Sequence, residues 1–97
     1  MNDIKKIKGL VIIGRKWRDK INGNTYHSAE VIIFTSDDIR SYKSGLTYGY
    51  GEQYLETAHQ LLVDLGWLKD DKMMWESLKD ADIDWTAREF YTLKKEL

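Results

Sequence analysis

An Asn-Gly dipeptide between two runs of β-branched residues most constrains how this 97-residue chain can fold. Asn22 and Gly23 tolerate positive φ at little cost, and such a pair is the strongest short-range signal of a β-hairpin. Residues 10–13 before it form an apolar run suited to a buried strand. Residues 25–34 after it are rich in Thr, Tyr, Val, Ile and Phe, which favours a second strand. We therefore expect an antiparallel hairpin built from these two runs.

The turn-forming residues 35–38 predict a further reversal, and residues 39–47 then favour a third strand. Gly45 weakens this segment, as is typical of an edge strand or a β-bulge. Because the connections are short, the three strands are expected to form an antiparallel meander.

The apolar spacing changes from a strand period to a helical one at Glu52. The positions that repeat at helical spacing are Leu55, Ala58, Leu62 and Leu65. Gly66 follows, as a glycine often does at a helix C-terminus. The sequence therefore predicts a main helix between Glu52 and Gly66, packed on the sheet.

A shorter second helix is expected to begin at a cap on Asp70 or Asp71 and to run through Lys79. Its apolar stripe would consist of Met74, Trp75, Leu78 and Ala81.

The end of the chain supports two interpretations. A strand places alternate residues on one face, namely Ile83, Trp85, Ala87, Tyr91 and Leu93. A helix would instead group Trp85, Phe90, Leu93 and Leu97. The aromatic and Thr content favours the strand, which we expect to return to the sheet.

Together these elements predict an α+β fold in a single domain over residues 1–97. A chain of this length is too short for two stable cores. The expected core contains Val11, Ile13, Val31, Ile33, Leu55, Ala58, Leu62, Leu65, Leu78 and Trp85. The chain has no cysteine, which excludes disulfides and thiolate metal sites and favours the cytoplasm. Its longest early apolar run is too short for a membrane span.

The charge is unevenly distributed along the chain. Residues 1–24 carry seven basic and two acidic side chains, a net charge of +5, whereas the remaining residues carry eight basic and fourteen acidic ones, a net charge of −6. Such halves suggest a surface with one end able to meet an anionic partner. A solvated, lysine-rich hairpin would produce the same asymmetry.

Two stretches supply candidate binding residues. The hairpin combines basic and aromatic side chains, which suits protein interfaces and nucleic acid alike. A glycine-bearing turn at residues 48–51 precedes the main helix, where free backbone N–H groups could meet an anion or only turn the chain. The candidates are Arg15, Lys16, Trp17, Arg18, Tyr26, Tyr48 and Tyr50.

Catalytic and metal-binding signatures were not found in the sequence. His27 and His59 are the only histidines, and they lie on different predicted elements with no cluster of His, Asp and Glu at ligand spacing. No nucleophile with an orienting acid is visible beside them. We therefore expect no catalytic residue, no metal ligand and no cofactor, and a protein that is not an enzyme.

The runs Asn22-Gly23-Asn24-Thr25-Tyr26-His27 and Tyr48-Gly49-Tyr50-Gly51, with Gly14-Arg15-x-Trp17 before them, resemble a group of small uncharacterised proteins of bacteriophages and mobile elements. The resemblance covers about the first two thirds of the chain. It implies a phage accessory protein that binds and blocks a host or defence-system component, as an anti-CRISPR does. A homodimer is also expected, because a weak edge strand is often covered by a second copy. The alternatives are a nucleic-acid-binding protein using the basic hairpin, or a small-ligand or nucleotide binder using the Tyr-Gly-Tyr-Gly loop.

Overall fold

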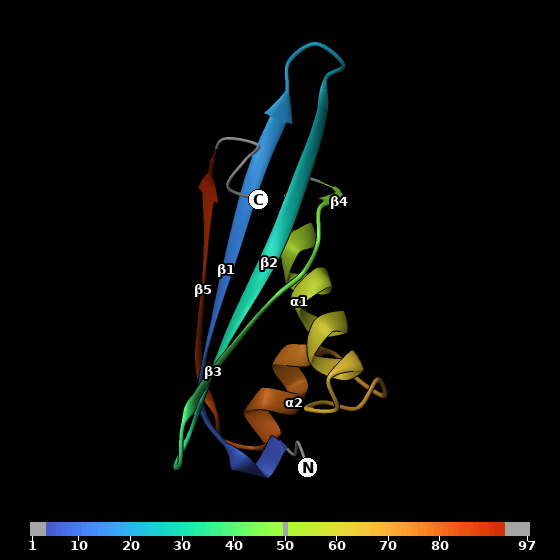
Figure 1. Ribbon diagram of the computed structural model, residues 1–97. Helices are drawn as coiled ribbons and strands as arrows, with labels where there is room; N and C mark the ends of the chain where they lie inside the picture. The colour runs from blue at the N-terminus through green and yellow to red at the C-terminus, as the bar shows by residue number, and fades with distance from the viewer. Residues whose placement is uncertain (1–3, 50, 93–97) are drawn as a thin grey trace.

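A long antiparallel β-hairpin is the central element of the fold. The computed structural model describes residues 4–49 and 51–92. Figure 1 shows this hairpin projecting beyond both helices, and the molecule measures 45 by 26 by 20 Å. The elements in chain order are η1 (Ile4–Lys6), β1 (Ile7–Asp19), β2 (Asn24–Thr35), β3 (Ile39–Lys43), β4 (Thr47–Tyr48), α1 (Gln53–Asp64), α2 (Met74–Asp80) and β5 (Asp84–Tyr91).

The five strands form one mixed sheet. Its order is β3-β2-β1-β5, and β4 pairs with β2 beyond the end of β3. β1, β2 and β3 are antiparallel as expected of the meander, but β5 lies parallel to β1 at the other edge. The fold is therefore α+β as predicted, but the sheet has five strands where four were expected, because β4 is added to the meander. The C-terminal strand is confirmed, and positions 93–97 of its pattern lie outside the described residues.

The hairpin tip is a four-residue loop rather than a two-residue Asn-Gly turn. The carboxylate of Asp19 accepts hydrogen bonds from the backbone of Ile21 at 3.0 Å and from the side chain of Asn22 at 2.7 Å. Gly23 adopts a φ of +73°, the left-handed conformation that glycine reaches without strain. Its N–H then donates to the carbonyl of Asp19 at 2.8 Å, which closes the loop. The predicted hairpin is confirmed, but Asp19 also organises its turn.

The third predicted strand is interrupted, which divides it into β3 and β4. Ser44 lies at the break, where its N–H donates to the carbonyl of Ala29 at 2.8 Å. Its hydroxyl oxygen in turn accepts the N–H of Ala29 at 2.9 Å, in place of a backbone carbonyl. A side chain therefore completes the ladder at the irregularity that Gly45 suggested.

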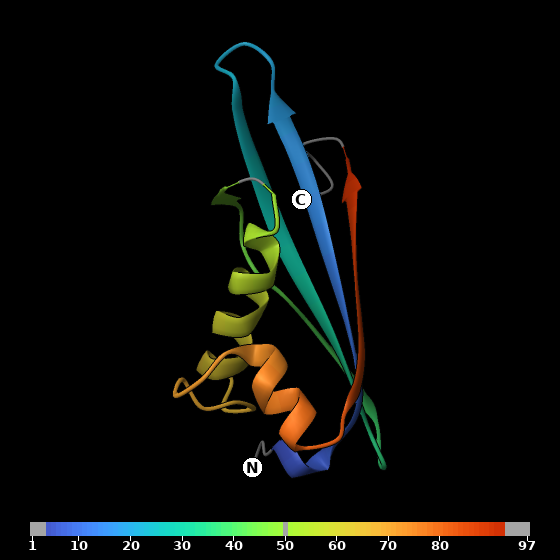
Figure 2. The ribbon, with the colours of Figure 1, turned by 180° about the vertical axis from the view of Figure 1, so that it is seen from behind.

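Both helices lie on the same side of the sheet (Figure 2). Side chains alternate between the faces of a strand, and the residues of β1 that face the helices are Leu10 and Ile12, at 2% and 0% exposure. Val11 and Ile13 point to the other face and are only partly buried, so their expected place in the core was wrong. All four residues are apolar, so the sequence pattern does not indicate which face of the strand the helices cover. The core positions Val31, Ile33, Ala58, Leu62 and Leu78 are confirmed, while Leu55, Leu65 and Trp85 pack at its border.

The predicted main helix is confirmed as α1, and its C-terminus is a Schellman motif. Gly66 has a φ of +84° and donates its N–H to Val63 at 3.0 Å. The N–H of Trp67 reaches back to the carbonyl of Leu62 at 2.9 Å, and both side chains are buried in the core. The hydrogen bonds and the apolar contact together satisfy this terminus and direct the chain back over the core.

The second helix begins later than predicted. Met73, and neither Asp70 nor Asp71, is the N-cap residue of α2, and no side chain caps this end. Trp67 and Leu68 are buried, so the preceding segment is held against the core and the helix starts only after it. Met74 and Leu78 form the buried stripe as expected, whereas Trp75 is 52% exposed.

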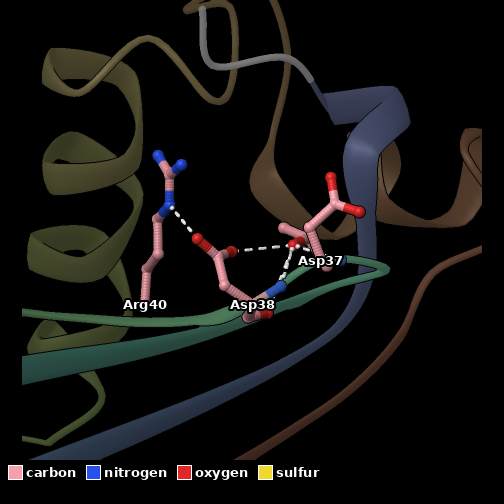
Figure 3. Close-up of polar contacts among 4 residues, drawn as sticks. Asp37, Asp38 and Arg40 are labelled. Carbon is pink, nitrogen blue, oxygen red and sulfur yellow. Dashed lines mark hydrogen bonds and ion pairs between the residues drawn. The ribbon is translucent and has the colours of Figure 1, made fainter.

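The turn between β2 and β3 is closed by side chains and reaches the helical layer. Thr35 Oγ1 accepts the N–H of Asp38 at 3.0 Å and donates to its carboxylate at 2.8 Å. Asp38 also pairs with Arg40 at 3.1 Å, and Figure 3 shows Asp37 directed away from that pair. The guanidinium of Arg40 lies 5.8 Å from the ring centre of Trp67. The turn is therefore linked to the segment that follows α1.

Candidate binding surface on the open face of the sheet

The face of the sheet opposite the helices, here called the open face, is covered by no other element among the described residues (Figures 1 and 2). At the end near the β2–β3 turn it carries apolar side chains from three strands. These are Val11 and Ile13 of β1, Ile32 and Phe34 of β2, and Ile39 of β3. Ile39 is 66% exposed, and the other four are partly buried. This is an extended apolar surface with no covering layer.

An ion-pair network crosses the middle of the open face. Arg15 of β1 pairs with Glu30 of β2 at 2.8 Å, and the hydroxyl of Ser41 of β3 donates to the same carboxylate at 2.7 Å. The Ser41 hydrogen bond, followed by the Arg15 guanidinium, holds the pKa of Glu30 below its usual value. The network links three strands and separates the apolar end of the face from the hairpin end.

Three aromatic rings gather at the hairpin end of the open face. Trp17 stacks on Tyr26, with ring centres 5.8 Å apart and planes at 23°. Tyr48 of β4 meets Tyr26 edge-on at 5.7 Å and is 60% exposed. β1, β2 and β4 each contribute one ring, so residues that are distant in sequence form one cluster, here called the aromatic cluster.

Four of the seven candidate residues therefore lie on one surface, namely Arg15, Trp17, Tyr26 and Tyr48. Arg18 is exposed on β1 close to the hairpin tip, with its register partner at Thr25. Tyr50 lies outside the described residues.

Lys16 does not belong to that surface. It follows Arg15 on the strand and therefore points to the helical side, where it is only 3% exposed. Its ammonium pairs with Glu89 of β5 at 2.6 Å and lies 5.8 Å from the ring centre of Tyr54 and 5.9 Å from that of Tyr91. The sequence groups Lys16 with Arg15 and Trp17 as candidate binding residues, whereas alternation along β1 separates its side chain from both.

Tyr54 explains a glycine in β1. A Cβ at Gly14 would lie 2.5 Å from the Tyr54 ring, so the ring of α1 rests directly on the strand backbone. Burial, with the nearby Glu89 and Glu52 carboxylates, raises the pKa of the Tyr54 phenol. Gly14 and Lys16 thus face the helices, whereas Arg15 and Trp17 face the open side of the sheet.

The glycine-bearing turn before α1 is built around a buried histidine. His27 is fully buried, with Nδ1 3.2 Å from the carbonyl oxygen of Gly49 and Nε2 2.6 Å from the hydroxyl of Thr57. Gly49 has a φ of +153°, and a Cβ there would lie 2.6 Å from Gln53 Cγ and 3.1 Å from His27 Cε1. Gly51 is left-handed at +65°. Conformation and packing therefore account for both glycines and for His27.

The apolar residues of the open face are the part of the surface that the sequence did not indicate. Val11 and Ile13 were expected in the core, and only knowing which face the helices cover could have moved them. Among the described residues, no group of three or more His, Asp or Glu side chains is arranged to hold a metal ion. No helix in the described part of the chain is long and apolar enough to cross a membrane.

Comparison with models of protein families, with curated proteins and with solved structures finds no match for this chain. The resemblance to phage proteins therefore stays a prediction that rests on the two sequence runs.

Proposed function

We propose that this is a non-enzymatic binding protein of phage accessory type, which docks a host or defence-system protein on the open face of its sheet. An inhibitor of bacterial defence such as an anti-CRISPR acts in this manner, and its site of action would be the host cytoplasm. The observation that carries the proposal is the uncovered apolar surface around Ile13 and Phe34. A free sheet face normally presents polar side chains to water, and a large exposed apolar patch marks an interaction site.

The hairpin end of the face offers the residue types that dominate protein interfaces. Trp, Tyr and Arg are enriched among the residues that contribute most of the binding energy. Trp17 and Tyr26 support each other by stacking, and Tyr48 presents a largely exposed ring. A partner covering both ends of the open face would bury its apolar end and the aromatic cluster in one contact.

The test is to compare surface variants in capture from host lysate, followed by affinity measurement on the captured protein. Trp17→Ala should weaken binding by roughly 2 kcal/mol or more if this ring is an anchor. Tyr91→Ala is the matched control, because this ring is 74% exposed and lies with Lys16 on the helical side of the sheet. Ile13→Asp should abolish capture, since it places a charge among the apolar side chains at one end of the open face. A partner that binds both open-face variants as well as the parent would exclude this surface.

Single-stranded nucleic acid is the second candidate, and the aromatic cluster favours it. Aromatic rings on a sheet face beside basic residues are how several modules stack bases. Arg15 is already paired with Glu30, and Arg18, which follows Trp17 on β1, is exposed close to the hairpin tip. Fluorescence anisotropy with a labelled oligonucleotide should then show affinity that falls steeply with salt, because bound phosphates release counterions. Nuclease treatment of the lysate separates the two candidates, since only a nucleic-acid-mediated capture is lost.

A homodimer is proposed as the form that presents this surface. β5 pairs only with β1 within the described sheet, and an unpaired strand edge can recruit a second copy. Light scattering at high micromolar concentration should give twice the chain mass of 11.4 kDa. A monomer mass at that concentration would remove the dimer without affecting the docking proposal.

A further inference from the structure

A cavity on the helical side of the sheet combines acidic and aromatic walls. It has a volume of about 380 Å³, within the range of small-ligand sites. The residues that line it are Glu52, Gln53, Leu55, Glu56, His59, Met73, Met74, Trp75 and Trp85. They come from α1 with the residue before it, the start of α2, and β5. Both helices lie on one side of the sheet in Figure 2, and β5 is an edge strand of that sheet. The lining contains two carboxylates and no Lys or Arg.

The acidic wall belongs to one face of α1. Glu52, Glu56 and His59 are spaced by four and three residues, which places them along the same side of the helix. The amide nitrogen of Gln53 donates to one oxygen of Glu56 at 2.8 Å, which orients this carboxylate and leaves its other oxygen available. The Nε2 atom of His59 is buried and has no hydrogen-bond partner among the described residues. Two carboxylates therefore line one side of the cavity, and the side chain of His59 lies beside them.

The other wall is aromatic and exposed. Trp75 and Met73 are 52% and 55% exposed, and Trp85 of β5 is partly buried. Exposed Trp and Met side chains leave water next to apolar surface, and no described element covers them. An indole ring attracts a cation over its face, more strongly than the other aromatic rings do. Carboxylates add charge-assisted hydrogen bonds to a cation that carries N–H groups.

We propose that this cavity is a binding site for an organic cation with N–H donors, either a protonated amine or a guanidinium. Glu52 and Glu56 hold the charge, and the rings of Trp75 and Trp85 contact the cation and its apolar stem. The source is a free amine or the Lys or Arg side chain of a polypeptide. The site lies on the helical side of the sheet and is independent of the open face.

The experiment uses NMR to follow the indole N–H signals of ¹⁵N-labelled protein during titration with n-butylammonium chloride. Single Trp→Phe variants assign the four indole signals. The expected result is a saturable shift of Trp75 and Trp85, with Trp17 unmoved. Two controls isolate the charge: n-butanol as the neutral isostere, and sodium chloride at the same ionic strength. Equal shifts with n-butanol, or no saturable shift with the ammonium probe, would overturn the proposal.

Variants then test the two walls. The double change Glu52→Gln and Glu56→Gln should weaken binding at least about tenfold, because hydrogen bonds to charged groups are lost. Trp75→Ala should weaken it about fivefold, as for an exposed cation–π contact. Asp64→Asn is the matched control, being an exposed carboxylate on the same helix that does not line the cavity. Melting curves confirm that each variant is folded, and unchanged affinity in the folded double variant would overturn the proposal.

The source of the cation is separated by two further probes. Agmatine represents a free amine with a guanidinium, and acetyl-Gly-Arg-Gly-amide represents an arginine in a chain. Tighter binding of agmatine assigns the site to free amines, whereas tighter binding of the capped peptide assigns it to a basic side chain of a protein. Either order supports the site, and binding of neither contradicts it. Trp17→Ala should leave both affinities unchanged, so the result is distinguishable from any failure of the open-face proposal.

Discussion

The two faces of the sheet are built from the same strands, yet they have opposite relations to the rest of the molecule. Ile12 is fully buried beneath the helices, whereas Ile13, the next residue, lies on the open face and is partly exposed. Likewise the ammonium of Lys16 is enclosed by Glu89, Tyr54 and Tyr91, while the Arg15 network lies on the uncovered side. Similar residues thus pack against the helices on one face and stay partly exposed on the other.

Residue type alone therefore does not identify the core of this protein. On the helical side, apolar side chains contribute stability within the chain. On the open face, similar side chains contribute less because they remain partly exposed to water. Matched substitutions at neighbouring positions test this difference between the two faces.

The largest expected difference is between Ile12→Ala and Ile13→Ala. Ile12→Ala should lower the free energy of unfolding by about 3 kcal/mol, because it removes a fully buried side chain and leaves a cavity. Ile13→Ala should cost about 1 kcal/mol or less, since the site is open to water. Chemical denaturation of both variants checks this. Equal losses of stability would mean that Ile13 is buried in solution as completely as Ile12, and would contradict the description of an open face.

The glycines of β1 give the next largest difference. A Cβ at Gly14 would lie 2.5 Å from the Tyr54 ring, so Gly14→Ala should destabilise by roughly 1–3 kcal/mol through overpacking. Gly9→Ala is the matched control on the open face, where the nearest atom would be 3.8 Å away. Its unfolding midpoint should stay close to that of the parent. If Gly14→Ala were equally harmless, the contact between α1 and the strand would be looser than described.

A smaller difference is expected between the two ion pairs. Glu89→Gln leaves the ammonium of Lys16, whose side chain is 4% exposed, without its carboxylate, and should cost about 1–2 kcal/mol. Glu30→Gln should cost about 0.5 kcal/mol, because Arg15 is 27% exposed and can be solvated. Thermal unfolding of both variants at neutral pH measures the two losses of stability. A larger loss for Glu30→Gln would show that the Arg15 network carries more of the fold than Lys16 does.

The smallest effect is the pH dependence of the open-face network. The pKa of Glu30 is lowered from 4.5 by Ser41 and Arg15, so its stabilisation is complete above pH 4.5. It is lost as the pH falls from there through the lowered folded-state value. The parent should therefore lose slightly more stability than Glu30→Gln between neutral pH and the acid range, by about 0.5 kcal/mol after solvent screening. Parallel pH profiles for the two proteins would contradict the role of this network.

Much of the fold could be predicted because the signals are local. Gly23 and Gly66 both adopt positive φ where the sequence indicated a turn and a helix end, since only glycine reaches these conformations without strain. The helical spacing of Ala58 and Leu62 identified the buried side of α1. The alternation from Ile83 onward identified β5 as a strand.

The candidate surface was predictable in part. Trp17 and Arg15 were singled out by residue type, and both lie on the open face. Lys16 was included because it is their neighbour in sequence, although neighbours in a strand point to opposite faces. The acidic and aromatic cavity was missed, because Glu56 and Trp85 approach one another only in the folded chain.

The amino-acid sequence was sufficient to predict the hairpin, the main helix and the positions of their turns, because backbone preferences and periodicity act over a few residues. Only the tertiary structure decided which face of β1 is inside, that β5 lies parallel to β1, and that Lys16 is enclosed. These features depend on where the helices pack. A strand with apolar residues on both faces, such as residues 10–13, is compatible with either orientation until one face is covered.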